Sequence, residues 1–320
     1  MNVLDNQEIL IVGGTGSLGS TLVKLLANNY KPKGIRVFSR GEFLQWKLKN
    51  ELKQKGLLNN ISFLIGDIRD YDRVWRASQK VDIIINCAAL KQIDTCEYNP
   101  IEAVQTNIKG TENVINAALD SNVKKVMFIS TDKVVQPTTL YGATKLVAEK
   151  LMIDANVYSG GRFPYFSCCR YGNVLGSRGS VIPLFREQIK QKKLTITDIN
   201  MSRFWIKLET VAQFLLDRVK EMKGKEIFIP IMKSCFVTDI AKIIAPDISY
   251  NIIGIRENEK LDEILISRDE SKHAQIKNNY FVIHPDYIQY DLFEYSSNPH
   301  SRSEAEVFTK EELKELIKNV

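Results

Sequence analysis

The sequence predicts an α/β protein with a Rossmann-type doubly wound parallel sheet, followed by a smaller mixed α/β domain. Two observations indicate this fold class. Up to Tyr171, short β-branched runs alternate with longer helical patterns, as in a parallel sheet that is covered by helices on both faces. Glycines at positions 13, 16 and 19 directly follow the first apolar run, at the turn where such a sheet enters its first helix.

The elements follow one another in a regular order in the first half of the chain. Predicted strands lie at 8–12, 35–38, 61–65, 81–85, 126–129 and 165–169, and predicted helices at 18–28, 43–54, 101–121 and 141–158. After Tyr171 the pattern changes. A loop at 172–179, an amphipathic helix at 208–222, a capped terminal helix at 309–317 and short strands at 194–197, 226–229, 250–255, 263–267 and 281–284 follow. We expect one domain at 1–172 and a second at 173–320, with helix 208–222 and strand 226–230 returning to the first.

Composition and charge exclude several classes of function. The net charge is +6, but Lys and Arg are interspersed with Asp and Glu, so we expect no nucleic-acid partner. No apolar run approaches ~18 residues and the amino terminus lacks a secretory pattern, which predicts a cytoplasmic protein without a membrane partner. The five cysteines form no C-x-x-C pair, and all three histidines lie in the last fifth of the chain, so no metal site is expected.

The turn after the first strand is a candidate phosphate-binding site. Its backbone amides can approach a pyrophosphate at a helix amino terminus, where the helix dipole favours anions. The residues of this turn expected to bind a cofactor are Gly13, Thr15, Gly16, Ser17, Leu18 and Gly19. Ser39 and Arg40 end the second strand, and an arginine there suits the 2'-phosphate of NADP, although an ordinary surface arginine is the alternative.

Further candidate cofactor residues follow later strands. Asp67 and Ile68 come just after the third strand, where they can contact an adenine, and Ala88 and Ala89 follow the fourth strand, where small side chains let a cofactor pass closely. Asn107 completes the predicted cofactor set, together with Tyr141 and Lys145. The predicted cofactor is NADP.

Two sets of motifs resemble a known family. The glycines at 13, 16 and 19, with Tyr141-Gly-Ala-Thr-Lys145, resemble the extended short-chain dehydrogenase/reductase superfamily. Longer strings resemble the soluble, configuration-inverting UDP-N-acetylglucosamine 4,6-dehydratases that begin pseudaminic acid synthesis. These strings lie at 88–100, 130–133, 140–145, 203–206 and 254–263. The chain departs from the family pattern at Asp94, at Gly41 and in a lengthened tail at 299–306.

The resemblance implies a catalytic role for each of five residues. Tyr141 would take the carbon 4 hydroxyl proton, with Lys145 lowering the phenol pKa by its charge and Thr131 positioning the partners. Lys133, kept neutral by desolvation and the nearby Lys145 charge, would remove the carbon 5 proton. Asp132, in its protonated form, would donate to the departing carbon 6 hydroxyl. A solvated ion pair at a strand end is the alternative for Asp132 and Lys133.

The resemblance also implies which residues bind the UDP-sugar, placing them in the second domain and one preceding loop. They are Lys91, Asn173, Ser177, Val181, Arg203, Arg256 and Glu259. Arginines suit a diphosphate because their planar fork can bond two oxygens. A surface arginine, a structural asparagine or an ordinary loop position is the alternative for each.

Three other functions remain open from sequence. An NAD(P)-dependent nucleotide-sugar epimerase would use the tyrosine-lysine pair without the Asp-Lys pair. A retaining 4,6-dehydratase would carry methionine in place of Tyr141, and a catalytically silent NADP-binding sensor would tend to lose that tyrosine. The resemblance further implies a homo-oligomer that pairs through helices near 141–158, on which Leu146, Val147 and Leu151 are expected to face the core.

Overall fold

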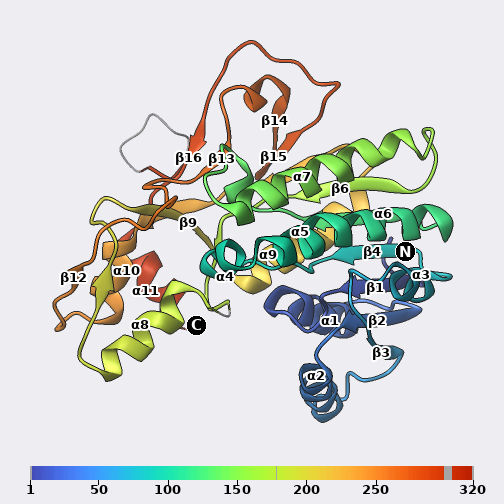
Figure 1. Ribbon diagram of the computed structural model, residues 1–320, viewed down its shortest axis with the longest axis horizontal. Helices are drawn as coiled ribbons and strands as arrows, with labels where there is room; N and C mark the ends of the chain where they lie inside the picture. Colours follow the sequence, from blue (N-terminus) through green and yellow to red (C-terminus); the bar gives the residue numbers. More distant parts are fainter. Residues whose placement is uncertain (1, 178, 299–304, 319–320) are drawn as a thin grey trace.

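The computed structural model describes residues 2–177, 179–298 and 305–318. Within these ranges the main sheet contains β1 (Glu8–Val12), β2 (Gly34–Ser39), β3 (Ile61–Ile65), β4 (Ile83–Asn86), β5 (Lys125–Ile129), β6 (Tyr165–Cys169), β10 (Ile227–Pro230), β14 (Ala274–Lys277) and β15 (Tyr280–Ile283). Their order is β14-β15-β10-β6-β5-β4-β1-β2-β3 (Figure 1). β1 to β6 and β10 run parallel, whereas β15 and β14 are antiparallel to their neighbours. The order β3-β2-β1-β4-β5-β6 is that of a doubly wound sheet, so the predicted fold class is confirmed.

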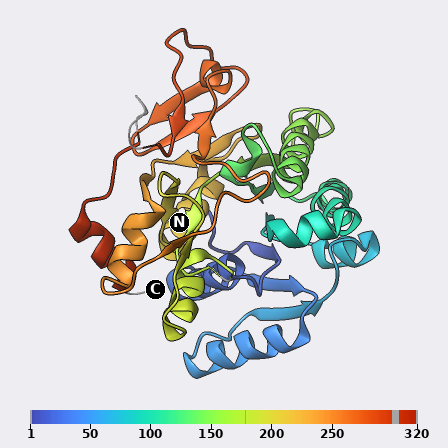
Figure 2. The ribbon, with the colours of Figure 1, turned by 60° about the vertical axis from the view of Figure 1, so that its left-hand side comes forward.

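Helices cover both faces of this sheet (Figures 1 and 2). α1 (Ser17–Asn29) packs beside α9 (Leu208–Glu221) on one face, and α3 (Tyr71–Ser78), α6 (Gly110–Asp120) and α7 (Leu140–Asp154) pack together on the other. α2 (Glu42–Gln54) follows β2. The central strands β1, β4, β5 and β6 are buried along almost their whole length, and their side chains form one continuous core with the inner faces of the helices.

The helix that was predicted at 101–121 is interrupted. α5 (Pro100–Val104) passes into a π-helical turn, η1 (Gln105–Lys109), before α6 begins. Asn107 lies in this turn, where its side-chain amide accepts a hydrogen bond from the backbone N–H of Leu90 at 2.8 Å and donates to the carbonyl of Leu90 at 3.0 Å. The wider π-helical turn therefore places the Asn107 side chain where it binds the backbone of Leu90, in the segment after β4.

The second half of the chain forms smaller sheets and a separate core. β7 (Asn173–Val174), β9 (Ser202–Ile206) and β11 (Lys233–Phe236) form one sheet, β8 (Thr195–Ile196) pairs with β12 (Asn251–Ile252), and β13 (Ile264–Ile266) pairs with β16 (Tyr295–Ser296). The helices are α8 (Val181–Lys190), α10 (Val237–Ile244) and α11 (Lys310–Lys318). Phe185, Trp205, Ile240 and Leu313 are buried in this core. The sequence did not predict α8 or α10, whereas α9 and α11 are confirmed.

The domain boundary at residue 172 stays a prediction. Several strands of the second half join the main sheet, so the two halves share that sheet. β10, β14 and β15 extend that sheet beyond β6. None of the helices in the described ranges has both the length and the apolar character that crossing a membrane requires. Residues 299–304, part of the lengthened tail, lie outside the described residues.

The exposed face of α7 differs from the prediction. Val147 and Leu151 are 43% and 37% exposed, whereas Ala148 and Met152 are buried against the sheet. The buried face of the helix contains Lys145, Ala148 and Met152, so Val147 and Leu151 lie on the outer side. The expectation that Val147 and Leu151 belong to the core is wrong.

Candidate active site

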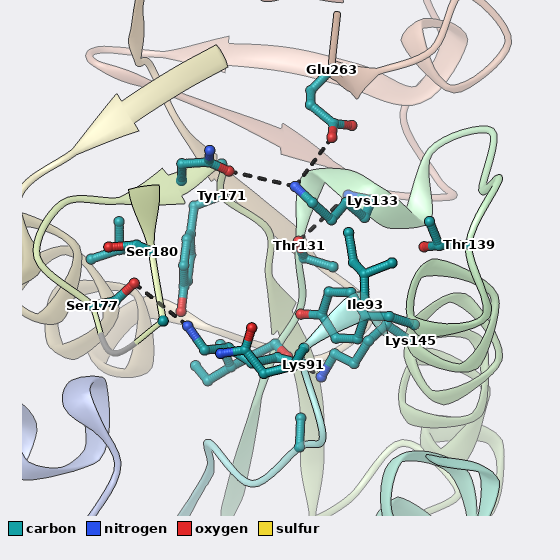
Figure 3. Close-up of a pocket in the computed structure, with 18 of the residues that line it drawn as sticks. Lys91, Ile93, Thr131, Lys133, Thr139, Lys145, Tyr171, Ser177, Ser180 and Glu263 are labelled. Atoms are coloured by element: carbon teal, nitrogen blue, oxygen red, sulfur yellow. Dashed lines mark hydrogen bonds and ion pairs between the residues drawn. The ribbon is translucent and has the colours of Figure 1, made fainter. Parts of the chain in front are cut away.

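A cavity of about 480 Å³ opens at the carboxyl ends of the central strands (Figure 3). Segments of the second half close it from the other side, as expected for the ligand site of an open parallel sheet. The structure brings many of the predicted residues into its lining. These are Gly13, Gly16, Ser17, Leu18, Gly19, Ala89, Lys91, Thr131, Lys133, Tyr141, Lys145, Asn173, Ser177, Val181, Arg203, Arg256 and Glu259.

The glycine turn has no room for side chains. Gly13 has a φ of +76°, and a β-carbon on it would lie 2.8 Å from the backbone nitrogen of Ala88. A β-carbon on Gly19 would lie 2.5 Å from the carbonyl oxygen of Gly13. Gly16 occupies the N-cap of α1, so the helix amino terminus faces the cavity without a capping side chain or an acidic residue in its first turn. This arrangement fits the pyrophosphate of a dinucleotide.

Four predicted cofactor residues stand outside the cavity lining, at the ends of β2 and β3. The Ser39 hydroxyl accepts from the Gln45 amide at 3.1 Å, and the Ile68 side chain belongs to the core. Arg40 is half exposed, and its Nη1 lies 3.8 Å from Oδ2 of Asp67. Asp67 therefore competes with any phosphate for the Arg40 guanidinium.

The other three predicted cofactor residues outside the lining are Thr15, Ala88 and Asn107. Thr15 is buried, and Ala88 packs against Gly13. Direct cofactor contact by Asn107 is not supported, because its amide is occupied by Leu90 and by the Thr144 hydroxyl at 3.0 Å. Asn107 instead fixes the segment that leads from Ala88 and Ala89 toward the cavity.

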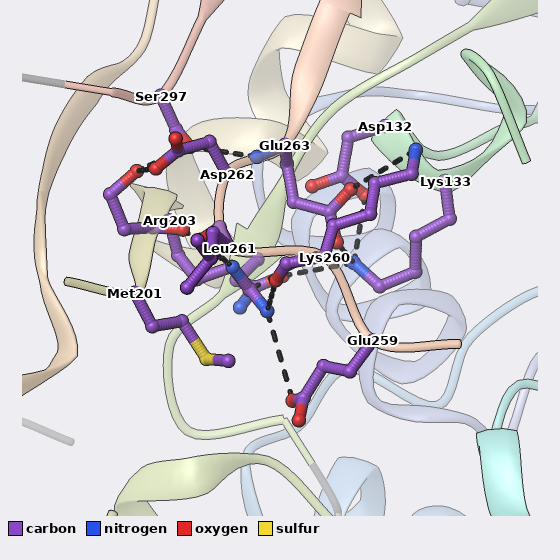
Figure 4. A network of polar contacts seen from close by, with 12 residues as sticks. Asp132, Lys133, Met201, Arg203, Glu259, Lys260, Leu261, Asp262, Glu263 and Ser297 are labelled. Atoms are coloured by element: carbon purple, nitrogen blue, oxygen red, sulfur yellow. Dashed lines mark hydrogen bonds and ion pairs between the residues drawn. The ribbon is translucent and has the colours of Figure 1, made fainter. Parts of the chain in front are cut away.

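Asp132 and Lys133 lie on a single turn of 3-10 helix, η2 (Asp132–Val134), just after β5. Thr131 caps this turn, and its hydroxyl donates to Oδ1 of Asp132 at 2.9 Å. The Lys133 Nζ lies 3.0 Å from Asp132 Oδ1 and 3.5 Å from Asn173 Oδ1. Glu263, which the sequence analysis did not identify, supplies a third acceptor with its Oε1 3.2 Å from Lys133 Nζ (Figures 3 and 4).

The expectation that Lys133 is neutral is wrong for this geometry. Burial alone lowers the pKa of Lys133, but the negative charges of Glu263 and, when it is ionised, of Asp132 outweigh burial and raise it. Lys145, whose charge was expected to lower the pKa of Lys133, is not among the main groups that shift it. In this arrangement Lys133 carries its proton.

Asp132 is completely buried behind Lys133 and is not part of the cavity lining. Its Oδ2 has no hydrogen-bond partner among the described residues. Burial raises the pKa of Asp132 and the Glu263 charge raises it further, against the opposing effect of Lys133. The carboxyl is thus biased toward the protonated form that an acid needs, but it reaches the cavity only through its neighbours.

Tyr141 and Lys145 lie one turn apart at the start of α7. Thr139 caps this helix by accepting from the backbone N–H of Gly142 at 3.1 Å. Burial raises the pKa of the Tyr141 phenol to about 12, while the Lys133 charge and a hydrogen bond with Thr131 act in the lowering direction. The cation beside the phenol is therefore Lys133, and not Lys145 as expected.

Lys145 is almost fully buried beneath the cavity floor. Its Nζ donates to the Ile129 carbonyl at 2.5 Å and lies 3.7 Å from the centre of the Phe128 ring. Burial lowers the pKa of Lys145 to about 7, with Glu149 among the groups that oppose the shift. The lysine consequently changes charge near neutral pH.

The predicted sugar and nucleotide residues line the wall opposite the glycine turn. Arg203 is buried and donates to the carbonyls of Ser202 at 2.6 Å and Leu261 at 2.8 Å, which occupies part of its fork (Figure 4). Its Nη2 lies 3.7 Å from Oε1 of Glu259. Arg256 is exposed, with one nitrogen 4.0 Å from Asp94. Among these residues Arg256 is the arginine most open to an anion.

Lys91, Ser177 and Val181 lie close together at one side of the cavity. Lys91 Nζ lies 3.5 Å from the Ser177 hydroxyl, and burial together with the Lys133 charge lowers the pKa of Lys91. Val181 is the first residue of α8 rather than a loop residue.

Several lining residues were missed by sequence reasoning. Thr139, Tyr171, Lys260 and Glu263 all border the cavity. Glu263 begins an apolar strand-like run, and nothing in that local pattern distinguishes it from a solvated strand end. Only the pairing of β13 with β16 and its packing on η2 bring it to Lys133. The described residues contain no group of three His, Cys, Asp or Glu arranged to hold a metal ion.

The doubly wound sheet, the glycine turn and the Tyr-x-x-x-Lys pair at the start of α7 define the class: a Rossmann-type enzyme of the extended short-chain dehydrogenase/reductase type. Within that class, the chain belongs to the family described as polysaccharide biosynthesis protein, which matches residues 9–285.

Individual relatives agree with this assignment. The chain is 46% identical over 285 residues to a Campylobacter jejuni UDP-N-acetylglucosamine 4,6-dehydratase (inverting), covering 88% of this chain and 84% of the relative. It is 37% identical to a UDP-glucose 4-epimerase of Rickettsia bellii, covering 98% of this chain and 96% of the relative. The X-ray structure of Pen from Bacillus thuringiensis superposes with a TM-score of 0.91 at 41% identity, covering 99% of each chain.

Proposed function

We propose that this chain is an inverting UDP-N-acetylglucosamine 4,6-dehydratase, a hydro-lyase that forms UDP-2-acetamido-2,6-dideoxy-β-L-arabino-hex-4-ulose. The observation that carries this proposal is the Asp132–Lys133 pair, with its 3.0 Å contact: Lys133 lines the same cavity as Tyr141 and Lys145, and Asp132 lies buried next to it. A redox pair alone suffices for epimerisation, whereas removing water needs an additional base and acid. The similarity to the Campylobacter jejuni dehydratase supports the same reaction.

The cofactor that we propose is NADP, held by the glycine turn at the start of α1 and by Arg40. When bound, it supplies the acceptor for a hydride from carbon 4 and returns that hydride to carbon 6. Arg40 supports NADP over NAD because a guanidinium binds phosphate with two parallel hydrogen bonds. Ala88 and Ala89 leave space where the cofactor passes β4.

In the first step Tyr141 takes the proton of the carbon 4 hydroxyl. Its phenol is difficult to ionise where it lies, and the Lys133 charge and the Thr131 hydroxyl are the groups that favour the phenolate. Lys145, with a pKa of about 7, can change its charge at the floor of the same cavity. The resulting carbon 4 ketone makes the carbon 5 proton removable.

In the second step Lys133, once it has lost a proton, takes the carbon 5 proton on its nitrogen. The electrons of that C–H bond form the C5–C6 double bond, and the carbon 6 hydroxyl leaves as water with a proton from Asp132. Because Asp132 does not line the cavity, we propose that this proton travels through the Thr131 hydroxyl, 2.9 Å from Asp132 and itself in the lining. Once hydride has been added at carbon 6, the electrons of the C5–C6 double bond form the carbon 4 enolate, and carbon 5 takes a proton from water on the opposite face, which inverts it.

The decisive experiment is incubation of the chain and UDP-N-acetylglucosamine in deuterated water, followed by proton NMR of the product. A dehydratase yields a 4-keto-6-deoxy sugar that carries deuterium at carbon 5, and the ring couplings report inversion or retention at that carbon. A product that keeps all its oxygen and differs only at carbon 4 would establish the epimerase instead. Absence of any product, with normal NADP binding, would favour the sensor.

We also propose that the product of this chain enters pseudaminic acid synthesis.

We propose, in addition, that the chain pairs with a second copy through α7. Val147 and Leu151 are exposed on α7, and Tyr98 and Ile101, which are 90% and 67% exposed, lie on α4 (Ile93–Tyr98) and α5, the two helices that pack against α7. Apolar patches of this kind commonly mark protein interfaces. Analytical ultracentrifugation of the wild-type chain and of Val147→Glu tests the pairing: the variant should sediment as the smaller species.

A further inference from the structure

Glu263 is a buried carboxylate to which neither the sequence motifs nor the proposed mechanism gives a role. It precedes β13, is 3% exposed, and its backbone N–H donates to the Ser297 hydroxyl at 2.9 Å. That anchor directs the side chain toward Lys133, as Figure 4 shows. Glu263 Oε2 has no hydrogen-bond partner among the described residues.

The Lys133 ammonium donates hydrogen bonds to Asp132 and Asn173 and forms an ion pair with Glu263. Oxygens of Asp132, Glu263 and Asn173 lie at 3.0, 3.2 and 3.5 Å from Nζ. An amine bonded in this way has a fixed position but no free lone pair. Lys133 must release one proton before it can act as a base.

The charges around Glu263 come from several elements. Lys133 on η2, Arg203 on β9 and Lys260 in the preceding loop act directly on Glu263. Asp132, Tyr141 and Lys91 face the Lys133 amine, and Glu259 faces Arg203. Arg203 Nε and Lys260 Nζ each lie 3.9 Å from a Glu263 oxygen. Burial raises the pKa of Glu263, but the charges of Lys133, Arg203 and Lys260 together lower it. Glu263 is thus the ionised carboxylate and Asp132 the carboxyl that tends to hold a proton.

We propose that Glu263 is a positioning residue for the elimination step: it holds the Lys133 amine between its own carboxylate and Asp132, and its charge sets the pH at which Lys133 becomes a base. The inference rests on the proposed function, in which Lys133 removes the carbon 5 proton. After that transfer, the new ammonium is held by the same two carboxyl groups.

Glu263→Gln tests the proposal, because glutamine keeps the size of the side chain and removes its charge. The first measurement is independent of turnover: the free protein, labelled with ¹³C at the lysine ε-carbons, is titrated by NMR, with the Lys133 signal assigned by its loss in Lys133→Met. The carboxylate raises the pKa of Lys133, so removing it should lower that pKa by about one unit or more. Glu257→Gln, an exposed acidic position in the same loop, is the matched control and should leave the Lys133 signal unchanged.

The second measurement follows the reaction. In Glu263→Gln the rate of deuterium entry at carbon 5 should level off at a lower pH than in the wild type, and the plateau should fall about tenfold because the amine is less well held. KM and the rate of cofactor reduction in a single turnover should change less than about threefold, since carbon 4 oxidation uses Tyr141. Glu263→Asp keeps the charge and should restore the pH at which the rate levels off.

Two outcomes would overturn this role for Glu263. One is a Lys133 titration in Glu263→Gln that superposes on the wild type. The other is an equal loss of carbon 4 oxidation and carbon 5 exchange in both Glu263 variants, which would indicate a purely structural role. The identity of the wild-type product tests the proposed function. The titration of Lys133 needs no turnover, so it tests the role of Glu263 even if that function is wrong.

Discussion

Gly142 packs directly against the carbonyl oxygen of Lys133, with no room for a β-carbon between them. The first turn of α7 thereby rests on the turn that carries the Asp132–Lys133 pair. This contact brings Tyr141, one residue before the glycine, into the same cavity as Lys133. The redox pair and the elimination pair are thus placed relative to each other by backbone packing as well as by side chains.

Gly142→Ala should separate these two turns. The added methyl group would overlap the Lys133 carbonyl, and overpacking of this kind lowers the free energy of unfolding by about 1 to 3 kcal/mol. Activity should fall by on the order of tenfold or more, because Tyr141 and Lys133 would no longer be aligned with the same bound substrate. Denaturant unfolding and steady-state kinetics measure the two effects.

Gly41→Ala is the control for this substitution. A β-carbon on Gly41 meets only Leu44 side-chain atoms at 3.5 Å or more, and the residue lacks a positive φ. Because Gly41 is the N-cap of α2, where alanine is less favourable than glycine, the unfolding free energy of the variant should fall by no more than about 1 kcal/mol, and its turnover should stay that of the wild type. If Gly142→Ala unfolds and turns over like Gly41→Ala, the proposed role of this contact is refuted.

Tyr141→Phe and Lys133→Met should stop the reaction at different points. Without the phenol, neither cofactor reduction nor carbon 5 exchange should occur, since both depend on carbon 4 oxidation. Without the Lys133 amine, carbon 4 oxidation should continue while carbon 5 exchange falls by about 10²-fold or more, the usual contribution of a general base. Stopped-flow absorbance of the reduced nicotinamide, followed by NMR of the quenched mixture, separates the two steps. Loss of both steps in Lys133→Met would instead assign that lysine to the redox half.

The sequence predicted the sheet well because its strands are local apolar runs. β1, β3 and β6 begin and end where the pattern of residues 8–12, 61–65 and 165–169 placed them. The glycine turn and the Tyr141–Lys145 pair were also recognisable, since each is a short motif beside a predicted strand or helix. The part of the cavity that is built from the first half of the chain was therefore largely visible in the sequence.

The protonation states were not visible, because they depend on groups that are distant in the chain. Lys133 and Glu263 are separated by 130 positions, and only the folding of β13 onto η2 brings them to 3.2 Å. Reasoning from Lys133 and its near neighbours gave a neutral amine, whereas the second carboxyl group, Glu263, favours the charged form. Similarly, the π-helical turn at Asn107 depends on a contact with Leu90 that no helical periodicity encodes.

Lys145 should make the stability of the fold depend on pH in a definite direction. Its pKa in the folded state is about 7, below the ~10.4 of an unfolded lysine. Between these values the unfolded chain binds more protons, so stability is lost as the pH falls toward 7 and gained as it rises. From about pH 7 to about pH 8.5 this one group should raise the free energy of unfolding by roughly 1.5 kcal/mol. Over this range its contribution to the free energy of unfolding approaches a slope of ~1.4 kcal/mol per pH unit.

Lys145→Met tests this linkage. The difference in unfolding free energy between wild type and variant, measured by urea denaturation across that pH range, should grow with pH in favour of the wild type. Lys150→Met, on the exposed face of the same helix, should keep the wild-type pH dependence. A Lys145→Met curve that runs parallel to the wild type would show that Lys145 remains charged in the folded protein.

Arg40→Ala should change which nicotinamide cofactor the chain prefers. The guanidinium lies 3.8 Å from Asp67 and is half exposed, so it is free to exchange that partner for a 2'-phosphate. A charge-assisted hydrogen bond contributes about 1.5 to 3 kcal/mol, so the Kd for NADP should rise roughly 10- to 100-fold while the Kd for NAD stays nearly constant. Isothermal titration calorimetry with both cofactors measures the ratio, and Arg76→Ala, an exposed arginine on α3, controls for general loss of positive charge. Equal weakening of NADP and NAD binding would exclude contact between Arg40 and the 2'-phosphate, and would place the source of any NADP preference elsewhere in the cavity.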